Sequence, residues 1–284
     1  MISKTFHLEF LTPCFCAGAD QTRAELRPSA IRGQLRWWFR AMCGTKEDEA
    51  AVFGSVHESM TSGSSVIIRA AASSKGGEDR WWEGIQSQGM DRSAYLLGFF
   101  CGRTGRLKSG AALAPGSTGV ISLTYSKPID QRLKASVDLA VDMFFSVGAI
   151  GFRTTRAAGA FACMECALTS ATWSEKENQL RKCGFRTELS PKPFTSWKQL
   201  VGDAGYQLKH RFRSKSEGLG ISAGRNGTSP NVLGSADPRQ ASVLHFRPVK
   251  IDGQLRLLLL EAPHQRILGE DTLNHSGYKR QILT

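Results

Sequence analysis

The sequence predicts an α+β protein in which antiparallel sheets carry helices on one face. Three features indicate this class: an alternating apolar segment at residues 3–12, two segments with apolar residues at helical spacing at 28–42 and 130–147, and a hairpin pattern in the last third. The chain has 284 residues, of which 41% are hydrophobic, and this is enough for two domains with separate cores. We expect a first domain at residues 1–169 and a smaller one at 170–284.

The first domain is expected to begin with a strand in which Phe6, Leu8 and Phe10 alternate with polar residues. A helix follows, with Pro28 at its start and an apolar stripe along one side, and it is expected to end at Gly44. The stripe consists of Ile31, Leu35, Trp38, Phe39 and Met42.

Two further strands are expected at 64–72 and 119–126, on either side of an insertion that contains a short apolar helix near 94–100. The second helix, 130–147, and a strand at 161–168 complete the domain. The order strand, helix, strand, strand, helix, strand is the ferredoxin-like (RRM-like) arrangement, a four-stranded antiparallel sheet with two helices on one face.

The last third contains a hairpin at 242–260, whose strands are joined by the favoured turn pair Asp252-Gly253. This hairpin is expected to anchor the smaller domain. Residues 173–186 are charged and poorly patterned, and residues 216–238 are rich in Gly, Ser, Asn and Pro. Both are interpreted as connecting segments.

The chain is strongly basic, with 37 Lys and Arg against 25 Asp and Glu, a net charge of +12 and a pI near 9.6. A charge of this size favours a polyanionic partner such as nucleic acid. The first residues do not form the apolar core of a signal peptide, and no run approaches the roughly 18 apolar residues that a membrane span needs. We therefore expect a cytoplasmic protein with no membrane partner.

The segment GAIGFRTTRAAGAF, residues 148–161, combines glycines with arginines. Glycine lets the main chain approach a ligand closely, and arginine matches phosphate oxygens in charge and geometry. The segment therefore predicts a phosphate-binding loop, and the alternative is a purely structural turn. The candidate residues are Gly148, Gly151, Arg153, Arg156 and Gly159.

A second candidate lies on the first helix, where Arg32, Arg36 and Arg40 are four residues apart and form one stripe. These charges repel one another unless an anion lies across them. Trp37 is placed opposite the core face, where an indole could stack on a base. The alternative is a solvated helix edge with carboxylate partners from elsewhere in the chain.

A third candidate is the basic stretch 209–215, in which Lys209, Arg211 and Arg213 alternate with other residues. We expect a strand or extended arm that lines a nucleic-acid groove, and the alternative is a solvated run of charge. The loop at 102–110, with three positive charges, resembles a phosphate-binding loop only loosely.

The seven cysteines are an odd number, which favours reduced thiols over a disulfide framework. Cys163 and Cys166 form a C-x-x-C pair, and Cys14 and Cys16 a C-x-C pair, so a zinc site is conceivable. The segment around Cys163 is interpreted as a strand, however, and residues three apart on a strand point to opposite faces. We expect neither a metal nor a cofactor.

The inventory of catalytic residues is thin. The six histidines are scattered, and the chain contains no HExxH or G-x-S-x-G motif. We therefore expect a protein that is not an enzyme.

Four segments together are similar to the RAMP superfamily of CRISPR type III effector subunits: FLTPCFCAGAD, AELRPSAIRGQLRWWFRAM, EDEAAVFGS and GAIGFRTTRAAGAF. The resemblance is greatest to the family of subunit one of the Cmr (type III-B) complex. It rests chiefly on residues 12–18 and 25–40. Ala19 departs from the pattern in place of a glycine, and Ala157-Ala158 stands in place of Arg-Gly.

The resemblance implies two ferredoxin-like domains and a non-catalytic RNA-binding subunit of a ribonucleoprotein. It implies guide RNA and target RNA as partners, bound near the guide 3′ end by phosphate contacts and base stacking, together with other effector subunits. One alternative is a guide-processing endoribonuclease of the same superfamily that uses His7 or His57. Another is a basic scaffold for protein interactions.

Overall fold

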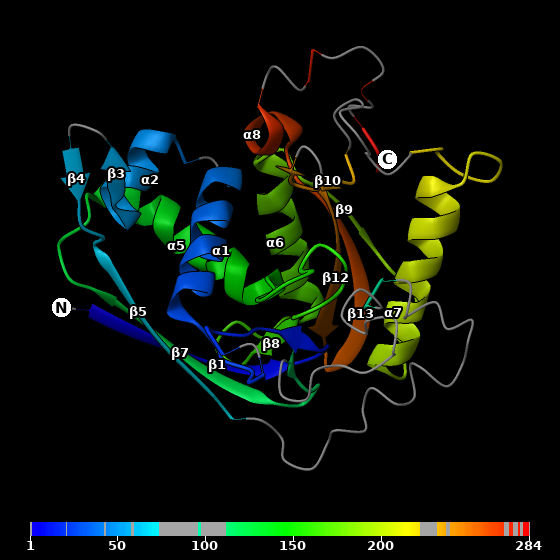
Figure 1. Cartoon of the computed structure of the whole chain (residues 1–284), viewed down its shortest axis with the longest axis horizontal. Helices are drawn as coiled ribbons and strands as arrows, with labels where there is room; N and C mark the ends of the chain where they lie inside the picture. The colour runs from blue at the N-terminus through cyan, green and yellow to red at the C-terminus, as the bar shows by residue number, and fades with distance from the viewer. Residues whose placement is uncertain are drawn as a thin grey trace. The chain divides into compact units, whose positions relative to one another are not determined.

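The protein was studied as a computed structural model, which describes residues 2–20, 22–42, 44–57, 60–73, 96–97, 112–221, 232–236, 239–269, 273–274, 278 and 281–283 (Figure 1). The described chain divides into two compact units. The first contains residues up to 73, 112–152 and 158–169, and the second contains 96–97, 153–157 and 170 onward. Residues 96–97 and 153–157 thus group with the second unit although they precede residue 169, and the domain boundary at residue 169 stays a prediction.

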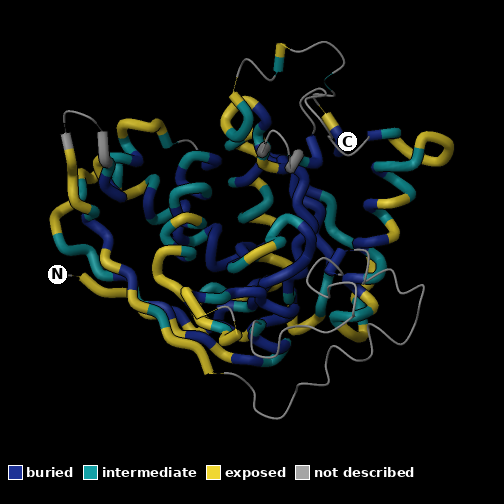
Figure 2. Tube along the Cα trace, in the orientation of Figure 1, coloured by how far each residue is buried: buried dark blue, intermediate teal, exposed yellow. Residues whose placement is uncertain are grey.

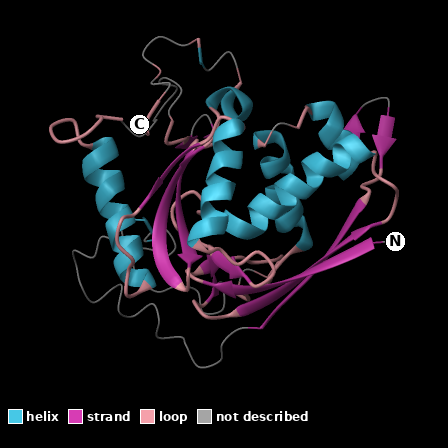
Figure 3. Cartoon of the chain, turned by 180° about the vertical axis from the view of Figure 1, so that it is seen from behind, coloured by secondary structure: helices cyan, strands magenta, loops and turns pink. Residues whose placement is uncertain are grey.

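The first unit is built on a four-stranded antiparallel sheet in the order β5-β7-β1-β8. The strands are β1 (Ile2–Phe10), β5 (Val66–Ser73), β7 (Thr118–Tyr125) and β8 (Phe161–Cys163). Helices α1 (Pro28–Ala41) and α5 (Gln131–Val147) lie on the same side of these strands (Figure 3). The predicted ferredoxin-like arrangement is confirmed, since the two central strands β1 and β7 are flanked by β8 and β5.

One face of this sheet forms the core of the first unit. Phe6, Leu8 and Phe10 are buried while the residues between them are exposed, as the alternation of a half-buried strand requires (Figure 2). From α5, the ring of Phe145 stacks on Phe6 with centroids 3.6 Å apart. The apolar stripe of α1 covers the same face, and Ile31 and other members of that stripe are buried.

Shorter elements surround the first sheet. Helix α2 (Lys46–Phe53) begins at Thr45, whose side chain accepts a hydrogen bond from the Asp48 N–H group. The small pairs are β2 (Cys14–Phe15) with β6 (Ala112–Leu113), and β3 (Ser55–His57) with β4 (Met60–Ser62). Of the helix expected near 94–100, only Leu96 and Leu97 are described, as helical and buried, and the loop at 102–110 lies outside the described residues.

The second unit contains a three-stranded antiparallel sheet in the order β12-β13-β9. Its strands are β9 (Arg186–Leu189), β12 (Leu244–Ile251) and β13 (Gln254–Glu261), and a short pair is formed by β10 (Ser235–Ala236) and β11 (Arg239–Gln240). The predicted hairpin is confirmed, with its turn at Asp252 and Gly253, whose φ angles are 49° and 74°. The residues 155–157 run beside β12, because Arg156 forms a parallel bridge with Phe246.

The helices of the second unit are α6 (Ser170–Lys182), α7 (Trp197–Tyr206), the π-helix η2 (Gln207–Arg213) and α8 (His264–Leu268). Two predictions are wrong here. Residues 173–186 are largely helix α6, which buries Trp173 and Leu180 two turns apart, and residues 209–213 continue α7 as η2 in place of a strand or arm. Leu208 and Phe212 are buried in η2, so apolar anchoring at helical spacing outweighs the alternating charge.

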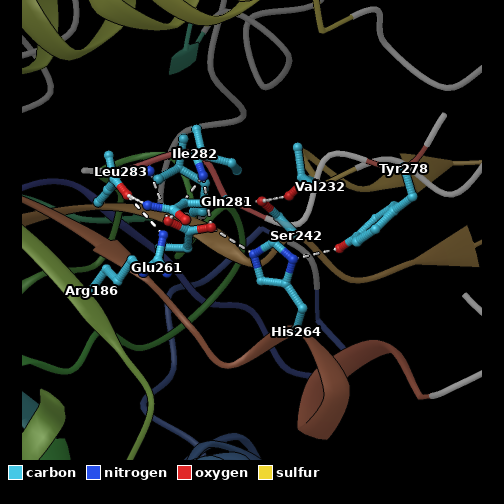
Figure 4. A network of polar contacts seen from close by, with 10 residues as sticks. Arg186, Val232, Ser242, Glu261, His264, Tyr278, Gln281, Ile282 and Leu283 are labelled. Carbon is cyan, nitrogen blue, oxygen red and sulfur yellow. Dashed lines mark hydrogen bonds and ion pairs between the residues drawn. The ribbon is translucent and has the colours of Figure 1, made fainter. Parts of the chain in front are cut away.

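The C-terminal residues of the second unit are held by the buried carboxylate of Glu261 at the end of β13 (Figure 4). Glu261 accepts hydrogen bonds from the N–H groups of Ile282 and Leu283, the latter at 2.8 Å, and lies 2.7 Å from His264 Nε2. The other ring nitrogen of His264 lies 2.8 Å from the Tyr278 hydroxyl. A buried carboxylate is tolerated because these polar partners replace water.

Candidate nucleic-acid interface

A basic pocket of about 740 Å³ opens beside α1, α2 and the β3–β4 hairpin in the first unit. Arg32, Arg36 and Arg40 line it from α1, and Lys46 lines it from α2. The three predicted arginines therefore lie together, as residues four apart on a helix should. We call this site the α1 pocket.

One carboxylate in the α1 pocket organises two of its arginines. Glu49 is 3% exposed, and it accepts hydrogen bonds from Arg36 Nε and from Arg40 Nη1, the latter at 2.7 and 2.8 Å. The arginine side chains remain 40% and 38% exposed. The carboxylate partner weighed as the alternative thus exists, but four cationic side chains still share the pocket with it.

Trp37 is less exposed than the helix pattern predicted. Its ring is half-buried and meets the ring of the fully buried Trp38 edge-on, with centroids 5.2 Å apart. The part of the indole that is accessible remains a candidate for stacking.

The glycines of residues 148–161 serve the packing of the first unit. A Cβ atom at Gly151 would lie 2.5 Å from the Phe15 carbonyl oxygen, and one at Gly159 would lie 1.8 Å from the Ile150 carbonyl oxygen. Both glycines also have positive φ angles, 91° and 66°. The N–H groups of Gly148 and Gly159 donate to Phe144 and Pro13 carbonyls, each at 2.8 Å. The prediction that these two N–H groups face phosphate is therefore wrong.

The prediction that Arg156 contacts phosphate is wrong as well. Its side chain is buried in the second unit, 5% exposed. The guanidinium donates to the carbonyls of Leu233 at 2.6 Å and Leu244 at 3.1 Å, and to the Ser242 hydroxyl at 3.3 Å. Arg156 therefore ties three segments of the second unit together.

Arg247, on β12, is a second buried arginine that the sequence did not single out. It is 1% exposed, donates to the Thr154 carbonyl at 2.6 Å and lies 2.9 Å from His245 Nδ1. Burial lowers the pKa of Arg247 to about 9, and burial followed by the charge of Arg247 lowers the pKa of His245 well below its ordinary value. Among the described residues, Arg247 has no carboxylate partner.

Arg153 and Arg213 are two half-buried arginines of the second unit. Arg153 has a positive φ of 61° and is half-buried. Burial, and after it the positive charge of Arg213, lowers the pKa of Arg153. The two guanidinium groups thus lie near each other and carry like charge. We call this pair the arginine cluster.

The two remaining candidates on η2, Arg211 and Lys209, differ in whether they are paired within the second unit. Arg211 makes a two-bond ion pair with Glu188, at 2.6 and 2.7 Å, which raises the pKa of Arg211. Lys209 is exposed. Arg211 is therefore engaged in the second unit, and Lys209 is accessible to a polyanion.

The cysteines of the first unit decide whether it could hold a metal ion. The chain turns after Cys163, where β8 ends, and the Cys163 thiol donates to Glu165 Oε2 at 3.3 Å. The strand predicted at 161–168 is therefore shorter than expected, so residues 163 and 166 do not lie on one strand. In the part of the chain that the structure describes, no group of three or more His, Cys, Asp or Glu side chains could hold a metal ion.

Sequence reasoning missed two residues in these sites. Phe152 is 50% exposed between Gly151 and Arg153, and an aromatic residue inside a glycine-arginine loop was the signal available. Lys46 completes the α1 pocket, but only the tertiary structure brings it beside α1.

Among the described residues, no helix is long and apolar enough to cross a membrane.

Comparison with known proteins finds a matching family, a curated relative and solved structures with the same fold. The family model of the RAMP superfamily matches residues 7–162. The Cmr subunit Cmr1-2 of the CRISPR system of Pyrococcus furiosus is 37% identical over 79 residues, which cover 25% of this chain and 40% of that protein. The chain thus matches well under half the length of this curated relative.

Solved structures share the fold. The crystal structure of Cmr1 from Pyrococcus furiosus in its apo form has a TM-score of 0.60 at 18% identity, with 92% of this chain and 88% of that chain covered. A chain in the cryo-EM structure of type III-B Cmr-beta bound to cognate target RNA has a TM-score of 0.56 at 12% identity, with 91% and 93% covered. The fold is therefore shared along nearly the whole length, and since the family model matches more than half of the residues, this chain belongs to the RAMP superfamily.

Proposed function

We propose that this protein is a non-catalytic RNA-binding subunit of a type III-B CRISPR effector complex. The observation that carries the proposal is the α1 pocket, where partly exposed arginines gather, together with the half-buried pair Arg153 and Arg213, in a RAMP chain with a net charge of +12. Guanidinium groups bind phosphate oxygens in a planar, two-bond geometry, and such phosphate contacts carry no sequence information. Guide RNA and target RNA are the partners proposed, with other effector subunits beside them.

The complexes of known relatives support the choice of RNA. A type III-B Cmr complex with a structurally similar chain has been solved with cognate target RNA. We propose that this chain contacts RNA near the guide 3′ end through Arg32, Arg36, Arg40, Lys46, Arg153 and Arg213. Partial stacking on Trp37 and Phe152 would add affinity that depends little on base identity.

Binding to single-stranded RNA and to duplex DNA of equal length, measured across a salt series, tests the proposal. We expect tighter binding to RNA, with log K falling by about 0.7 per neutralised phosphate against log salt. Arg36→Ala with Arg153→Ala should reduce that slope. The matched control is Arg181→Ala on α6, whose side chain is 62% exposed and pairs with Glu177. An equal slope in both variants would refute the assignment.

One geometric feature favours a second candidate, the guide-processing endoribonuclease. His7 Nδ1 lies 2.5 Å from Glu165 Oε1, and the His7 N–H group donates to Glu165 Oε2 at 2.8 Å. Burial opposes ionisation of Glu165, but these bonds outweigh it and lower its pKa to about 2. A carboxylate that orients a half-exposed imidazole is an arrangement suited to proton transfer.

Metal-independent cleavage of a guide precursor by the purified chain, lost in His7→Ala, would establish the endoribonuclease. The side chain of His57, the other histidine considered, lies outside the described residues. Intact precursor after incubation with the wild-type chain would leave the His7–Glu165 pair with a structural role, joining β1 to the turn after β8.

A further inference from the structure

A second pocket lies within the second unit, between the sheet and the helix formed by α7 and η2. Its volume is about 360 Å³. Leu257 and Leu259 of β13 and Phe194 supply its apolar surface, and Asp203 and Gln207 supply polar groups from the helix. Glu188 lines it from β9. A pocket with apolar surface and a few hydrogen-bonding groups suits a neutral ring system.

The rim of this pocket is held in place at both ends. The Ser190 N–H group donates to the Leu257 carbonyl, and the Phe194 N–H group donates to the Leu255 carbonyl, each at 2.8 Å. Between these anchors lies Pro191-Lys192-Pro193, whose two prolines restrict φ. Because the rim is fixed in advance, a ligand would lose little affinity to the ordering of this loop.

One buried atom of a residue that lines the pocket needs a donor. Gln207 Nε2 donates to Asp203 Oδ2 at 2.8 Å, one helical turn away. Gln207 Oε1, the other atom of this amide, is buried and has no hydrogen-bond partner among the described residues. A buried acceptor left without a donor costs free energy, so a ligand that presents an N–H group at this point would be favoured.

The charges around the pocket nearly cancel. The carboxylates of Glu188 and Asp203 line it together with the ammonium of Lys192, and Glu188 is paired with Arg211. Gln207 begins the same π-helix that ends at Arg213, a member of the arginine cluster. Short π-helical segments occur frequently at functional sites. A strand of RNA with a phosphate at the cluster would thus have a base near a pocket that accepts a neutral, hydrogen-bonding ring.

We propose that this pocket binds one unstacked nucleobase of the RNA, with Phe194 against its face and Gln207 Oε1 accepting from an N–H group on its Watson–Crick edge. The inference rests on the proposed RNA-binding function and adds to it a site for the base. Every RNA base has an N–H donor on that edge. The pocket therefore accepts any of the four bases and does not read sequence. A hydrophobic side chain of a partner protein is the competing occupant.

Two oligonucleotides test the pocket: oligouridine and oligo-N3-methyluridine of equal length. They have equal charge, and they differ in the N3–H donor that methylation removes. We expect the full-length chain to bind oligouridine about tenfold more tightly, the order of effect for leaving a buried acceptor unsatisfied. Gln207→Leu should remove this preference and keep the salt slope, and Gln265→Leu on α8 should retain both.

The outcomes separate this inference from the function on which it rests. Equal affinity of the wild-type chain for the two oligonucleotides, or a preference that survives in Gln207→Leu, would overturn the base pocket and leave the proposed RNA binding intact if the salt slope persists. Absence of binding to either oligonucleotide at low salt would overturn both. Phe194→Ala should weaken binding of the two oligonucleotides equally, since each retains its ring face, and unchanged binding there would contradict the stacking contact.

Discussion

The α1 pocket and the region around β12 in the second unit use arginine in opposite ways. In the α1 pocket, Arg36 and Arg40 share the carboxylate of Glu49 and keep their outer surfaces accessible. In the second unit, Arg156 and Arg247 are buried and bonded by carbonyl oxygens, a hydroxyl and an imidazole.

A buried carboxylate neutralises one charge and orients its arginines toward solvent, whereas carbonyl dipoles stabilise a guanidinium in place and remove it from solvent. The comparison teaches that a basic motif does not indicate which of its arginines binds a ligand. Burial and the hydrogen-bond partners decide this. We therefore expect substitutions of the buried arginines to change stability, and substitutions in the α1 pocket to change RNA binding.

The largest expected effect follows from removing a buried donor in the second unit. Arg156→Met should lower the free energy of unfolding by about 2–4 kcal/mol, because the buried carbonyls of Leu233 and Leu244 lose a donor. Urea unfolding measures this change. A variant as stable as the wild type would show that Arg156 does not hold these segments together.

In the α1 pocket, Glu49→Gln should cost about 1–2 kcal/mol of stability, less than a fully buried ion pair because both arginines are half-exposed. The same change removes a negative charge from the pocket, so RNA affinity at low salt should rise. Urea unfolding and RNA titration check the two effects. Lower affinity in a folded variant would indicate that Glu49 positions its arginines for RNA more than it neutralises them.

Acidification should lower the folding stability of the protein through His245 in the second unit. The pKa of His245 is depressed in the folded state by burial and then by Arg247, with a smaller contribution from Arg156. Below an unfolded-state pKa of about 6.5, the unfolded chain binds a proton that the folded chain does not, so stability falls by up to about 1.4 kcal/mol per pH unit. His245→Asn should remove this contribution, seen as a shallower loss of stability between neutral pH and acid. An unchanged pH profile would exclude His245 as the source.

The smallest expected effect concerns Ala157, which is buried with a φ of 64°. Glycine adopts this conformation without steric cost, so Ala157→Gly should stabilise the protein by about 0.5–1 kcal/mol, partly offset by the entropy of the unfolded chain. Thermal unfolding checks the sign. Destabilisation would mean that the methyl group of Ala157 contributes packing that outweighs its backbone strain.

Local periodicity was enough to predict much of the first unit. The alternation of Phe6, Leu8 and Phe10 and the stripes of α1 and α5 gave elements that the structure confirms, and the Asp252-Gly253 turn located the hairpin. The order of these elements was sufficient for the ferredoxin-like sheet.

The sites were harder to predict, because their properties depend on residues distant in sequence. Nothing near Arg36 in the chain identifies Glu49 as its partner, and nothing near Arg156 shows that Leu233 and Leu244 surround it. Gly159 belongs to a segment with the composition of a ligand-binding loop. Its position requires glycine for another reason, because the Ile150 carbonyl leaves no room for a Cβ atom. Helix η2 was not predicted, because the alternating charges of 209–213 indicated an extended segment. The helical signal was the spacing of the apolar residues Leu208 and Phe212, four residues apart.

The division between RNA-binding and structural arginines is tested by the salt dependence of single-stranded RNA binding, measured for Arg153→Ala with Arg213→Ala and for Arg156→Met. The first variant should lose up to about 1.4 from the slope of log K against log salt, the value for two phosphate contacts. The second, under conditions where it is folded, should keep the wild-type slope. A full slope in the first variant, or a reduced slope in the second, would contradict the assignment of accessible arginines to RNA and of the buried arginine to structure.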